Sequence, residues 1–501
     1  MKSILPEKLI KFAQTLPYPL YIVGGAVRDF AAGLHSETAD TDVCAPADVA
    51  DFAARAEKAG FEIKAEYKNT GTVKFSCGEE DFEFTCFRSD EYVRGGHRPV
   101  ATYLTDDINL DARRRDFKCN AVYYDIAAGK FVDPLGGLED IDNRRISTVA
   151  PAKKVFGEDG LRLMRLARIS AQTGFLPDAE CLQGALANSA LIRDVSAERI
   201  FAELMLILNA DKKYGISMGQ YAGLKILKNT GVLQIILPEL CAGEGMVQNK
   251  KYHKHDVLEH SLRCAAYADE RVRFAALLHD IGKPYCLKTA GNFIGHDEEG
   301  ARIAEEICAR LKAPKKLTEE TAELVKLHMY DFRCDARENK IRKFIIENVG
   351  ILDKLLLIKQ ADYSACTDDF SVAPSVEKFS KIYAAMKSEN VPFALKELAV
   401  KGNDLIEAGV PAQEVGNTLL QLLTDCAIKL CENDREKILT RLKKVYMPTL
   451  NPAVYAVYAQ KFAEEEAEKR AARAVAVADK KRLRAEKYGD GKRKKSSPKS
   501  S

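Results

Sequence analysis

The sequence contains no tryptophan, and none of its apolar runs approaches the length needed to cross a membrane. Its first residues, MKSILPEKLIKF, contain neither the long apolar core nor the cleavage site of a signal peptide. The 13 cysteines are scattered without a CxxC pair, which argues against a zinc ribbon and against a disulfide framework. We therefore expect a cytoplasmic, reduced protein that makes no contact with membranes.

The residues that are present have the composition of a globular protein. Of 501 residues, 46% are hydrophobic and 30% are charged, and this length supports two to four packed units. The net charge of +3 is unevenly distributed, because thirteen Lys or Arg face three Asp or Glu from Lys469 to Ser501. That end carries +10 and residues 1–468 carry −7. Since it is also poor in apolar residues, residues 461–501 are expected to form a basic, disordered tail. A charged helix is predicted at 453–486 and is expected to run into this end.

One stretch near the N-terminus combines a glycine turn with a short helix. The apolar run Tyr18–Val23 predicts a buried strand, and Gly24-Gly25 then allows a sharp turn. Residues 26–32 predict a short helix. Free backbone N–H groups and the positive end of the helix dipole favour a phosphate at such a turn, where Arg28 could bind its oxygens. The pattern therefore predicts nucleotide binding around Gly25 and Arg28.

Two carboxylates follow this turn. If Asp40 and Asp42 lie on a strand, the period of two puts both on one face. Carboxylates placed together beside a triphosphate would hold Mg²⁺ for phosphoryl transfer. Either motif alone is more often a plain turn or a solvated acidic loop. The combination at this spacing favours catalytic, metal-binding roles for Asp40 and Asp42.

Four more motifs follow in order. They read RRRDFKCNA (Arg113–Ala121), DPLGG (Asp133–Gly137), EDGLRLMRLAR (Glu158–Arg168) and SAERIFAEL (Ser196–Leu204). The whole series resembles the class II CCA-adding enzymes and the bacterial poly(A) polymerases. The resemblance implies an α+β protein, in which a mixed α/β nucleotidyltransferase head of the polymerase β type precedes an all-α neck, an HD domain and a C-terminal helical body.

The resemblance and the charge distribution together predict five parts. They are a nucleotidyltransferase head at 1–148, a helical, RNA-binding neck at 149–245, an HD metal-dependent phosphohydrolase-like domain at 246–370, a helical body at 371–460 and the basic tail at 461–501. Within the neck, apolar spacing predicts helices at 158–172, 179–188, 196–209 and 217–229. Ser196 is expected to cap the third of these, in which Arg199 would brace Glu203.

Two further features of the head involve charged residues. In the alternating segment DFEFTCFR, Glu83 lies on the polar face of a predicted strand, where the family supplies a third acidic group near its metals. An ordinary exposed glutamate is the alternative. Among three consecutive arginines, the family's pattern favours Arg115 near the nucleotide, with Asp116 fixing either that arginine or the start of the next strand. Lys118-Cys119 departs from the family, which usually has a threonine and an apolar residue there.

A helix at 158–172 is predicted to read the incoming base. Cytosine and adenine share an edge with an amino group beside an unprotonated ring nitrogen, so a carboxylate and a guanidinium together would select both. Asp159 and Arg162, three apart on one helix, could form that pair, and Arg165 and Arg168 could bind phosphates or RNA. An acidic helix start with ordinary arginines is the alternative. Gly160 stands where the family usually has proline.

A second set of ligands lies in the HD segment. Its members occur in the order His260, His279-Asp280, His296, His328 and Asp362, which resembles the HD phosphohydrolase superfamily. Imidazole and carboxylate ligands suit Mn, Fe, Ni, Co or Mg, and His296 and His328 would allow a second metal. The resemblance implies hydrolysis of phosphomonoesters or 2′,3′-cyclic phosphates at RNA ends. His253 and His255 are expected to be ordinary loop residues.

The leading hypothesis is a template-independent tRNA nucleotidyltransferase. It would add CCA to tRNA 3′ ends from CTP and ATP with Mg²⁺, release pyrophosphate, and bind neither DNA nor membranes. A poly(A) polymerase is one alternative, and an HD phosphohydrolase or RNA-binding regulator with a secondary transferase head is another. Whether the enzyme adds all of CCA, which metal and substrate the HD site takes, and the oligomeric state stay open. The basic tail either adds phosphate affinity or only improves solubility.

Overall fold

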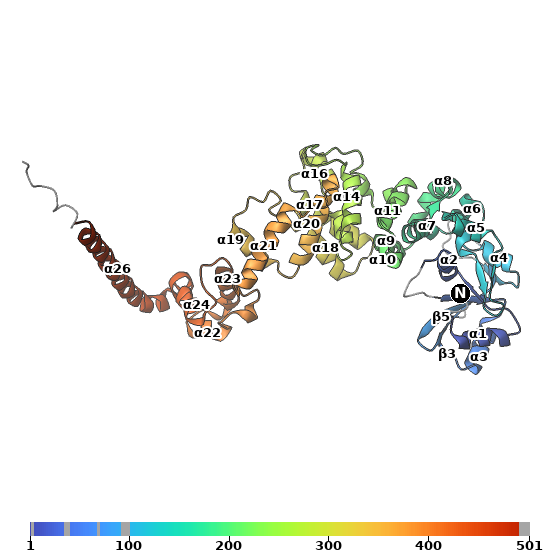
Figure 1. Cartoon of the computed structure of the whole chain (residues 1–501), viewed down its shortest axis with the longest axis horizontal. Coiled ribbons are helices and arrows are strands. Elements are labelled where there is room, and N and C mark those ends of the chain that lie inside the picture. The colour runs from blue at the N-terminus through green and yellow to red at the C-terminus, as the bar shows by residue number, and fades with distance from the viewer. Residues whose placement is uncertain (2–4, 35–40, 68–70, 92–100, 490–501) are drawn as a thin grey trace, which may run out of the picture. The chain divides into compact units, whose positions relative to one another are not determined.

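The structure, a computed structural model, describes residues 1, 5–34, 41–67, 71–91 and 101–489. The chain divides into two compact units, one formed by Met1–Phe332 with Asp353–Val376, the other by Arg333–Leu352 with Glu377–Ser501. The first unit contains a mixed β-sheet and many helices, and the second is helical (Figure 1). The expected α+β class is confirmed. The five predicted domain boundaries stay predictions.

The head is organised around a seven-stranded sheet with the order β3-β4-β5-β2-β1-β8-β9. Its strands are β1 (Tyr21–Val23), β2 (Thr41–Ala45), β3 (Glu62–Tyr67), β4 (Thr72–Cys77), β5 (Glu80–Cys86), β8 (Tyr123–Asp125) and β9 (Lys130–Val132). Only β2 and β5 pair in parallel, at the centre of the sheet. The predicted β8–β9 hairpin is confirmed. The strand expected over Tyr18–Val23 begins only at Tyr21, and β3 was not predicted.

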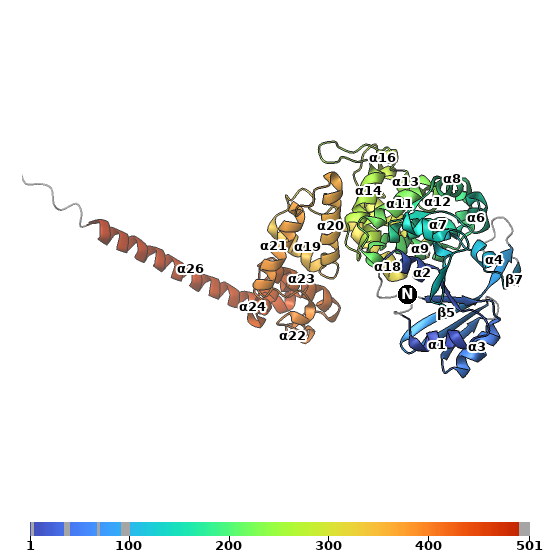
Figure 2. The same ribbon diagram turned by 45° about the vertical axis from the view of Figure 1, so that its right-hand side comes forward.

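Apolar side chains on one face of this sheet explain how its helices pack. Helices α1 (Glu7–Thr15) and α3 (Val49–Lys58) lie on one side of the sheet, and α2 (Gly25–Ala31) lies on the other (Figures 1 and 2). Phe52 of α3 stacks on Phe84 of β5 with ring centroids 3.7 Å apart. As expected from the alternation, Phe82, Phe84 and Cys86 are buried while Glu83 is not. The core therefore leaves the polar face of β5 available for a site.

The remaining elements of the first unit are mostly helices. They are β6 (Arg88–Glu91), β7 (Ala101–Leu104), α4 (Ile108–Arg113), α5 (Gly137–Asp142), β10 (Arg145–Ile146), α6 (Ala152–Glu158), α7 (Leu161–Thr173), β11 (Leu176–Pro177), α8 (Ala179–Asn188), α9 (Ala197–Leu208), α10 (Asp211–Tyr214), α11 (Gly219–Asn229), α12 (Val232–Ile236), α13 (Pro238–Cys241), α14 (Val257–Tyr267), α15 (Arg273–Leu278), α16 (Lys283–Ala290), α17 (His296–Arg310), α18 (Lys315–Leu327) and, from its second residue, α20 (Leu352–Thr367). Three of the four predicted neck helices match α8, α9 and α11 closely. The remaining one, predicted at 158–172, begins only at Leu161, because the chain breaks between α6 and α7 at Asp159-Gly160.

The second unit contains the C-terminal helices. They are α19 (Glu338–Glu347), α21 (Pro374–Ser388, from Glu377 on), α22 (Gly402–Glu407), α23 (Val415–Ala427), α24 (Arg435–Arg441), α25 (Met447–Leu450) and α26 (Pro452–Gly489). The charged helix predicted at 453–486 is confirmed by α26, which continues to Gly489, so disorder from residue 461 onward is wrong as far as 489. Residues 490–501 lie outside the described part of the chain. No helix among the described residues is both long enough and apolar enough to span a membrane.

Candidate functional site

The first candidate site lies where the glycine turn meets the central parallel strands. Asp42 of β2 stands in register with Glu83 of β5, so both carboxylates project from the same face. Gly24 has a φ of 82°, and a Cβ there would lie 3.3 Å from Oδ2 of Asp42, so glycine suits both the turn and the close approach. Asp42 and Glu83 line a cavity of about 200 Å³ together with Lys64 and Lys74. Asp40 lies outside the described residues.

Arg28 is buried and already bound within the protein. Helix α2 begins at Gly25, one residue before the predicted start. The Arg28 guanidinium, 4% exposed, donates through Nε to Asp29 Oδ1 at 2.8 Å and through Nη1 to Asn120 Oδ1 at 2.7 Å. Tyr214 of α10 donates to the second oxygen of Asp29. Arg28 therefore connects α2 to Asn120 elsewhere in the head. Its predicted contact with a phosphate stays a prediction.

Arg115 is held by a buried carboxylate that the sequence did not single out. Its Nη2 donates to Asp111 Oδ2 at 3.0 Å, and the Tyr123 hydroxyl donates to the same oxygen at 2.6 Å. Burial alone would raise the pKa of Asp111, but Arg115 and Arg114 outweigh it and lower the pKa to about 2. The carboxylate therefore stays charged, and the Arg115 guanidinium has a fixed position. Binding of a nucleotide by Arg115 stays a prediction.

One of the two roles expected for Asp116 was to fix Arg115. Its carboxylate instead binds other groups. Its Oδ2 accepts from Nε of Arg165 on α7 at 2.7 Å, and its Oδ1 accepts from the backbone N–H of Phe117 at 2.8 Å. The second alternative, fixing the entry of the chain to the next strand, stays a prediction. Burial would raise the pKa of Asp116, but Arg165 holds it well below its usual range. This ion pair connects the head to the first long neck helix.

The expected pair Asp159 and Arg162 does not lie on one helix. Asp159 has an extended backbone between α6 and α7, and its Oδ1 accepts from the Leu161 N–H at 2.9 Å. Arg162 is 5% exposed and donates to the backbone carbonyls of Val155 at 2.9 Å and Arg114 at 2.8 Å. The helical spacing predicted for the pair is therefore wrong. Their role in base reading is a separate matter and stays a prediction.

The remaining neck arginine, Arg168, is also paired. Its Nε lies 2.8 Å from Oε2 of Glu203 on α9, so the predicted brace between Arg199 and Glu203 within one helix is wrong. Ser196 stands at the predicted capping position, but its side chain makes no capping hydrogen bond. A sequence pattern cannot distinguish a partner on the same helix from one on a neighbouring helix, because both are a few ångströms away.

Gly160 is required by close packing between α7 and the turn before Val195. A Cβ at this position would lie 2.5 Å from the carbonyl oxygen of Leu191, and the ring of a proline would meet the same atom. We expect Gly160→Ala to lower the free energy of unfolding by about 1–3 kcal/mol, since backbone must move to admit the methyl group. Thermal melting monitored by circular dichroism tests this.

Gly416→Ala is the matched control for that variant. Gly416 lies in α23, and a Cβ there meets nothing within 4 Å. Alanine should raise stability by about 0.5 kcal/mol through its higher helix propensity. Equal melting temperatures for the two variants would contradict the close contact at Gly160.

The HD residues converge into a second site in the same unit. His260 of α14 and His279 at the end of α15 have their Nε2 atoms 3.2 Å apart, and Asp362 of α20 lies 3.0 Å from His260 Nε2. Asp280 lies between two groups of ligands. Its Oδ2 is 3.3 Å from His279 Nε2, while its Oδ1 is 3.3 Å from His296 Nε2 and 3.8 Å from His328 Nε2. All six predicted residues therefore come together.

Backbone contacts orient three of these imidazole rings. The Nδ1 atoms of His279, His296 and His328 lie 2.8, 2.7 and 2.6 Å from the carbonyl oxygens three residues before them. We assign the proton to Nδ1 in each, because a carbonyl only accepts, which leaves the Nε2 lone pair directed at the centre. Nε2 of His296 and of His328 is buried and makes no hydrogen bond to any described residue. Unsatisfied buried acceptors on two histidines match the needs of a metal centre.

Sequence reasoning missed two side chains near this centre, Lys283 and Gln248, and underestimated a third, His253. Lys283 Nζ donates to Asp280 Oδ2 at 2.6 Å and to Gln248 Oε1 at 2.7 Å. His253 lies in a loop, as expected, but its ring is 5.2 Å from that of His260. His255 instead lies 3.5 Å from Asp368, away from the ligands. A cavity of about 430 Å³, lined in part by His253, Lys283, Phe293 and Phe332, borders the site.

Comparison with known proteins agrees with this architecture. Residues 20–147 match the poly A polymerase head domain, residues 174–243 match a probable RNA and SrmB-binding site of polymerase A, and residues 257–363 match the HD domain. The chain is 30% identical over 408 residues to the A-adding tRNA nucleotidyltransferase of Deinococcus radiodurans, covering 76% of this chain and 84% of that protein. It is 27% identical over 424 residues to a multifunctional CCA protein of Xanthomonas campestris, covering 80% and 96%.

A solved structure leads to the same family. The crystal structure of the Bacillus stearothermophilus CCA-adding enzyme in complex with CTP matches with a TM-score of 0.63 and 25% identity, over 87% of this chain and 96% of that chain. The head, the RNA-binding segment and the HD domain follow one another in this order along the chain. This chain therefore belongs to the class II CCA-adding enzyme family, with a poly(A) polymerase-type head, an RNA-binding domain and an HD domain.

Proposed function

We propose that this protein is a tRNA nucleotidyltransferase that adds CCA to tRNA 3′ ends from CTP and ATP and releases pyrophosphate. The observation that carries the proposal is the similarity over most of the chain to nucleotidyltransferases named for adding CCA, or only A, to tRNA. The register of Asp42 with Glu83 beside the glycine turn supports it, since phosphoryl transfer needs clustered carboxylates. The cytoplasmic location expected from the sequence stays a prediction.

The head residues can be given separate tasks. Asp42 and Glu83, with Asp40, would hold Mg²⁺, for which carboxylate oxygens are suitable ligands. When bound, that ion stabilises the charge that develops on the phosphoryl group. Lys64 and Lys74, which line the same cavity, would attract the triphosphate. Arg115, held by Asp111, would bind the nucleotide without first having to be ordered.

We assign base selection to Asp159 and Arg162. The carboxylate would accept from the amino group shared by cytosine and adenine, and the guanidinium would donate to the ring nitrogen beside it. Hydrogen bonds to two backbone carbonyls hold the Arg162 guanidinium in one orientation. A rigid template of this kind discriminates better than a mobile arginine, because binding does not pay for its ordering. Arg165 and Arg168 would act beside it, toward phosphates or RNA.

The decisive experiment supplies the purified protein with three tRNA transcripts, ending before CCA, after its first C and after its second C. Each is incubated with the four nucleoside triphosphates singly and in mixtures. CCA addition predicts C incorporation on the first two transcripts, A on the third, and no use of UTP or GTP. An enzyme that adds A alone would extend only the third transcript. A poly(A) polymerase would ignore CTP and make a long A tract, which would overturn the proposal.

Asp159→Ala tests the template directly. Losing one bidentate contact should cost about 1–3 kcal/mol, so the preference for C and A over U and G is expected to fall about tenfold or more. The measurement is the ratio of kcat/KM values for CTP and UTP. Asp178→Ala is the control, because Asp178 also caps a neck helix, accepting from the Cys181 N–H at 2.7 Å. Unchanged selectivity in Asp159→Ala, or an equal loss in both variants, would refute base reading by Asp159.

For the HD site we propose a divalent transition metal or Mg²⁺ and hydrolysis of phosphomonoesters or 2′,3′-cyclic phosphates at RNA ends. His260, His279, Asp280 and Asp362 would hold one ion, and Asp280, His296 and His328 would hold a second. Bound metal would supply an activated water for the hydrolysis. Lys283, which donates to Asp280, would add positive charge where a phosphate arrives.

A further inference from the structure

Helix α26 consists of an anchored half and an exposed half. In the anchored half, Lys443 Nζ lies 4.4 Å from the ring centroid of Tyr458, and Lys444 Nζ lies 4.8 Å from that of Phe462. Beyond this point, every side chain that the structure describes from Ala463 to Arg484 is exposed. The second half thus makes no use of a hydrophobic core.

Sequence alone explains why the exposed half is still a helix. Six alanines occur between residues 467 and 478, and alanine has the highest helix propensity. A helix that is exposed all round gains little from packing, so packing does not explain where its charged residues stand. Their arrangement points to something outside the helix.

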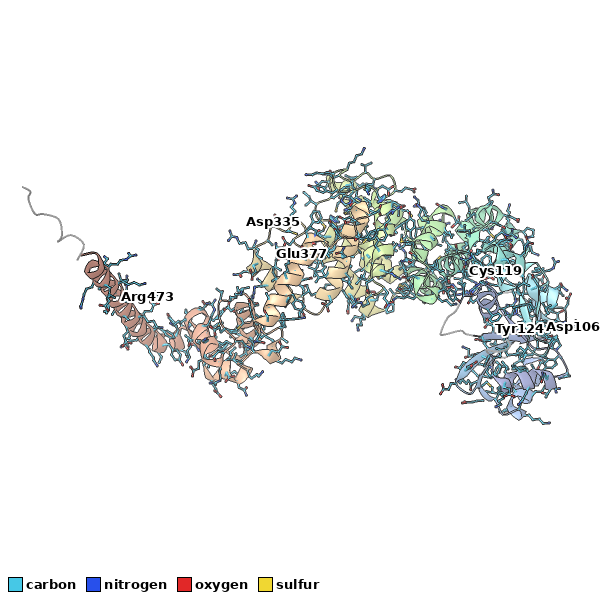
Figure 3. The ribbon with its side chains drawn as sticks, in the orientation of Figure 1. Asp106, Cys119, Tyr124, Asp335, Glu377 and Arg473 are labelled. Carbon is cyan, nitrogen blue, oxygen red and sulfur yellow. The ribbon has the colours of Figure 1, made fainter. Side chains whose placement is uncertain are left out.

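The charges of this segment are sorted by face. From Lys469 to Arg484 there are seven Lys or Arg and one acidic residue, Asp479. At 3.6 residues per turn, six of the seven fall within an arc of about 120°. These six, Lys469, Arg470, Arg473, Lys480, Lys481 and Arg484, are called the basic stripe. Asp479 and Glu468 lie on the far side, about 140° or more from the centre of the arc. Figure 3 shows Arg473 among the side chains that project from α26.

We propose that the basic stripe binds the phosphate backbone of RNA. Its length of about 22 Å, with a cation on nearly every turn, suits a chain of regularly spaced anions. The large apolar residues of the segment, Val475, Val477 and Leu483, point in three different directions around the helix, so it has no apolar face with which to enter a membrane. That the RNA is tRNA rests on the proposed function. The stripe adds affinity but no base preference, because phosphates carry no sequence information.

The test compares two variants of the full-length chain with wild type. The first, Arg473→Gln with Lys480→Gln, neutralises two positions of the stripe. The second keeps the composition and the net charge but moves both cations to the far side, by combining Ala471→Arg, Arg473→Ala, Ala478→Lys and Lys480→Ala. Circular dichroism confirms that both retain their helix content. Fluorescence anisotropy with labelled tRNA, without nucleotides, gives Kd over a series of salt concentrations.

Both variants are expected to bind tRNA about tenfold more weakly at 0.1 M salt, and the slope of log Kd against log salt should fall by about 1–2. If the variant with moved cations binds tRNA with wild-type affinity, the proposed role of the basic stripe is refuted, since net charge alone would then explain the binding. Wild-type affinity in the neutralised variant would overturn it as well.

Two further measurements separate this proposal from others. Vesicles of phosphatidylglycerol and phosphatidylcholine are not expected to bind wild type more strongly than the neutralised variant, and a difference confined to vesicles would overturn RNA as the ligand. Nucleotide addition is assayed separately. If wild type adds CCA but both variants bind tRNA as tightly as wild type does, only the role of the basic stripe is rejected. If the variants bind tRNA more weakly but wild type does not add CCA, only the proposed function is rejected.

Discussion

Replacing Asp42 with asparagine is expected to lower the rate of nucleotide addition at least about a thousandfold. Asparagine preserves the shape of the side chain but removes the negative charge, and a metal ion contributes several kcal/mol to phosphoryl transfer. Because the Asp42 side chain is exposed on β2, the melting temperature should stay within about 2 °C of wild type. Addition of CTP to a tRNA lacking CCA, measured beside thermal melting, tests both statements.

Two variants on β5 control this experiment. Asp81 lies on β5 and lines the same cavity, but it pairs with Lys64 at 2.5 Å and stands two residues before Glu83, the register partner of Asp42. Asp81→Asn should therefore retain activity within about twofold, while Glu83→Gln, directly opposite Asp42, should lose about tenfold or more. An active Asp42→Asn enzyme would refute the catalytic assignment. Equal losses in Asp81→Asn and Glu83→Gln would remove the special role of Glu83.

The second large effect is expected at the HD centre. Asp280 has one oxygen facing His279 and the other facing His296, so Asp280→Asn removes the charge from both groups of ligands at once. Hydrolysis of a 2′,3′-cyclic phosphate or a phosphomonoester should fall about a thousandfold. CCA addition should be unchanged, because the head has its own carboxylates. Assays over a panel of Mn²⁺, Ni²⁺, Co²⁺ and Mg²⁺ identify the metal.

A stability measurement makes this prediction independent of the substrate chosen. A metal that binds only the folded protein stabilises it by about 2.7 kcal/mol at a hundred times its Kd, so chelation should lower the wild-type melting temperature and added metal should restore it. Asp280→Asn should not respond, whereas Asp368→Asn, at the periphery beside His255 and Arg263, should respond like wild type. A wild-type protein that neither hydrolyses these esters nor responds to metal would contradict the HD proposal.

Local patterns predicted the elements whose residues alternate or repeat over a short distance. The alternation in β5 predicted which face Glu83 occupies, and the glycine turn predicted the start of α2 to within one residue. These features depend on backbone geometry within a few residues, which the sequence states directly. Strand β3 was not predicted, although polar and apolar residues alternate over Glu62–Tyr67. It lies at the edge of the sheet and none of its side chains is fully buried, so its hydrophobic signal is weak.

Partners distant in the chain could not be predicted in the same way. Fixing Arg115 was one of the two roles expected for Asp116, but its carboxylate pairs with Arg165, which is 49 residues away. The break between α6 and α7 at Asp159-Gly160 depends on the carbonyl of Leu191, which approaches Gly160 from a later turn. Such contacts arise only when the helices pack, and many neighbouring carboxylates could serve the same arginine equally well on sequence grounds.

The sequence by itself determined which chemical groups the protein possesses and in which order, including the six HD ligands from His260 to Asp362 and the carboxylates that follow the glycine turn. Residue type is enough for that, because only certain side chains bind metals or phosphates. Tertiary structure alone decided that Asp280 stands between two pairs of histidines, which come from four separate segments of the chain. It also decided that Arg162 is immobilised by the carbonyls of Val155 and Arg114. The physical reason is that a ligand's direction depends on its packed neighbours, and those neighbours come from segments far apart in the chain.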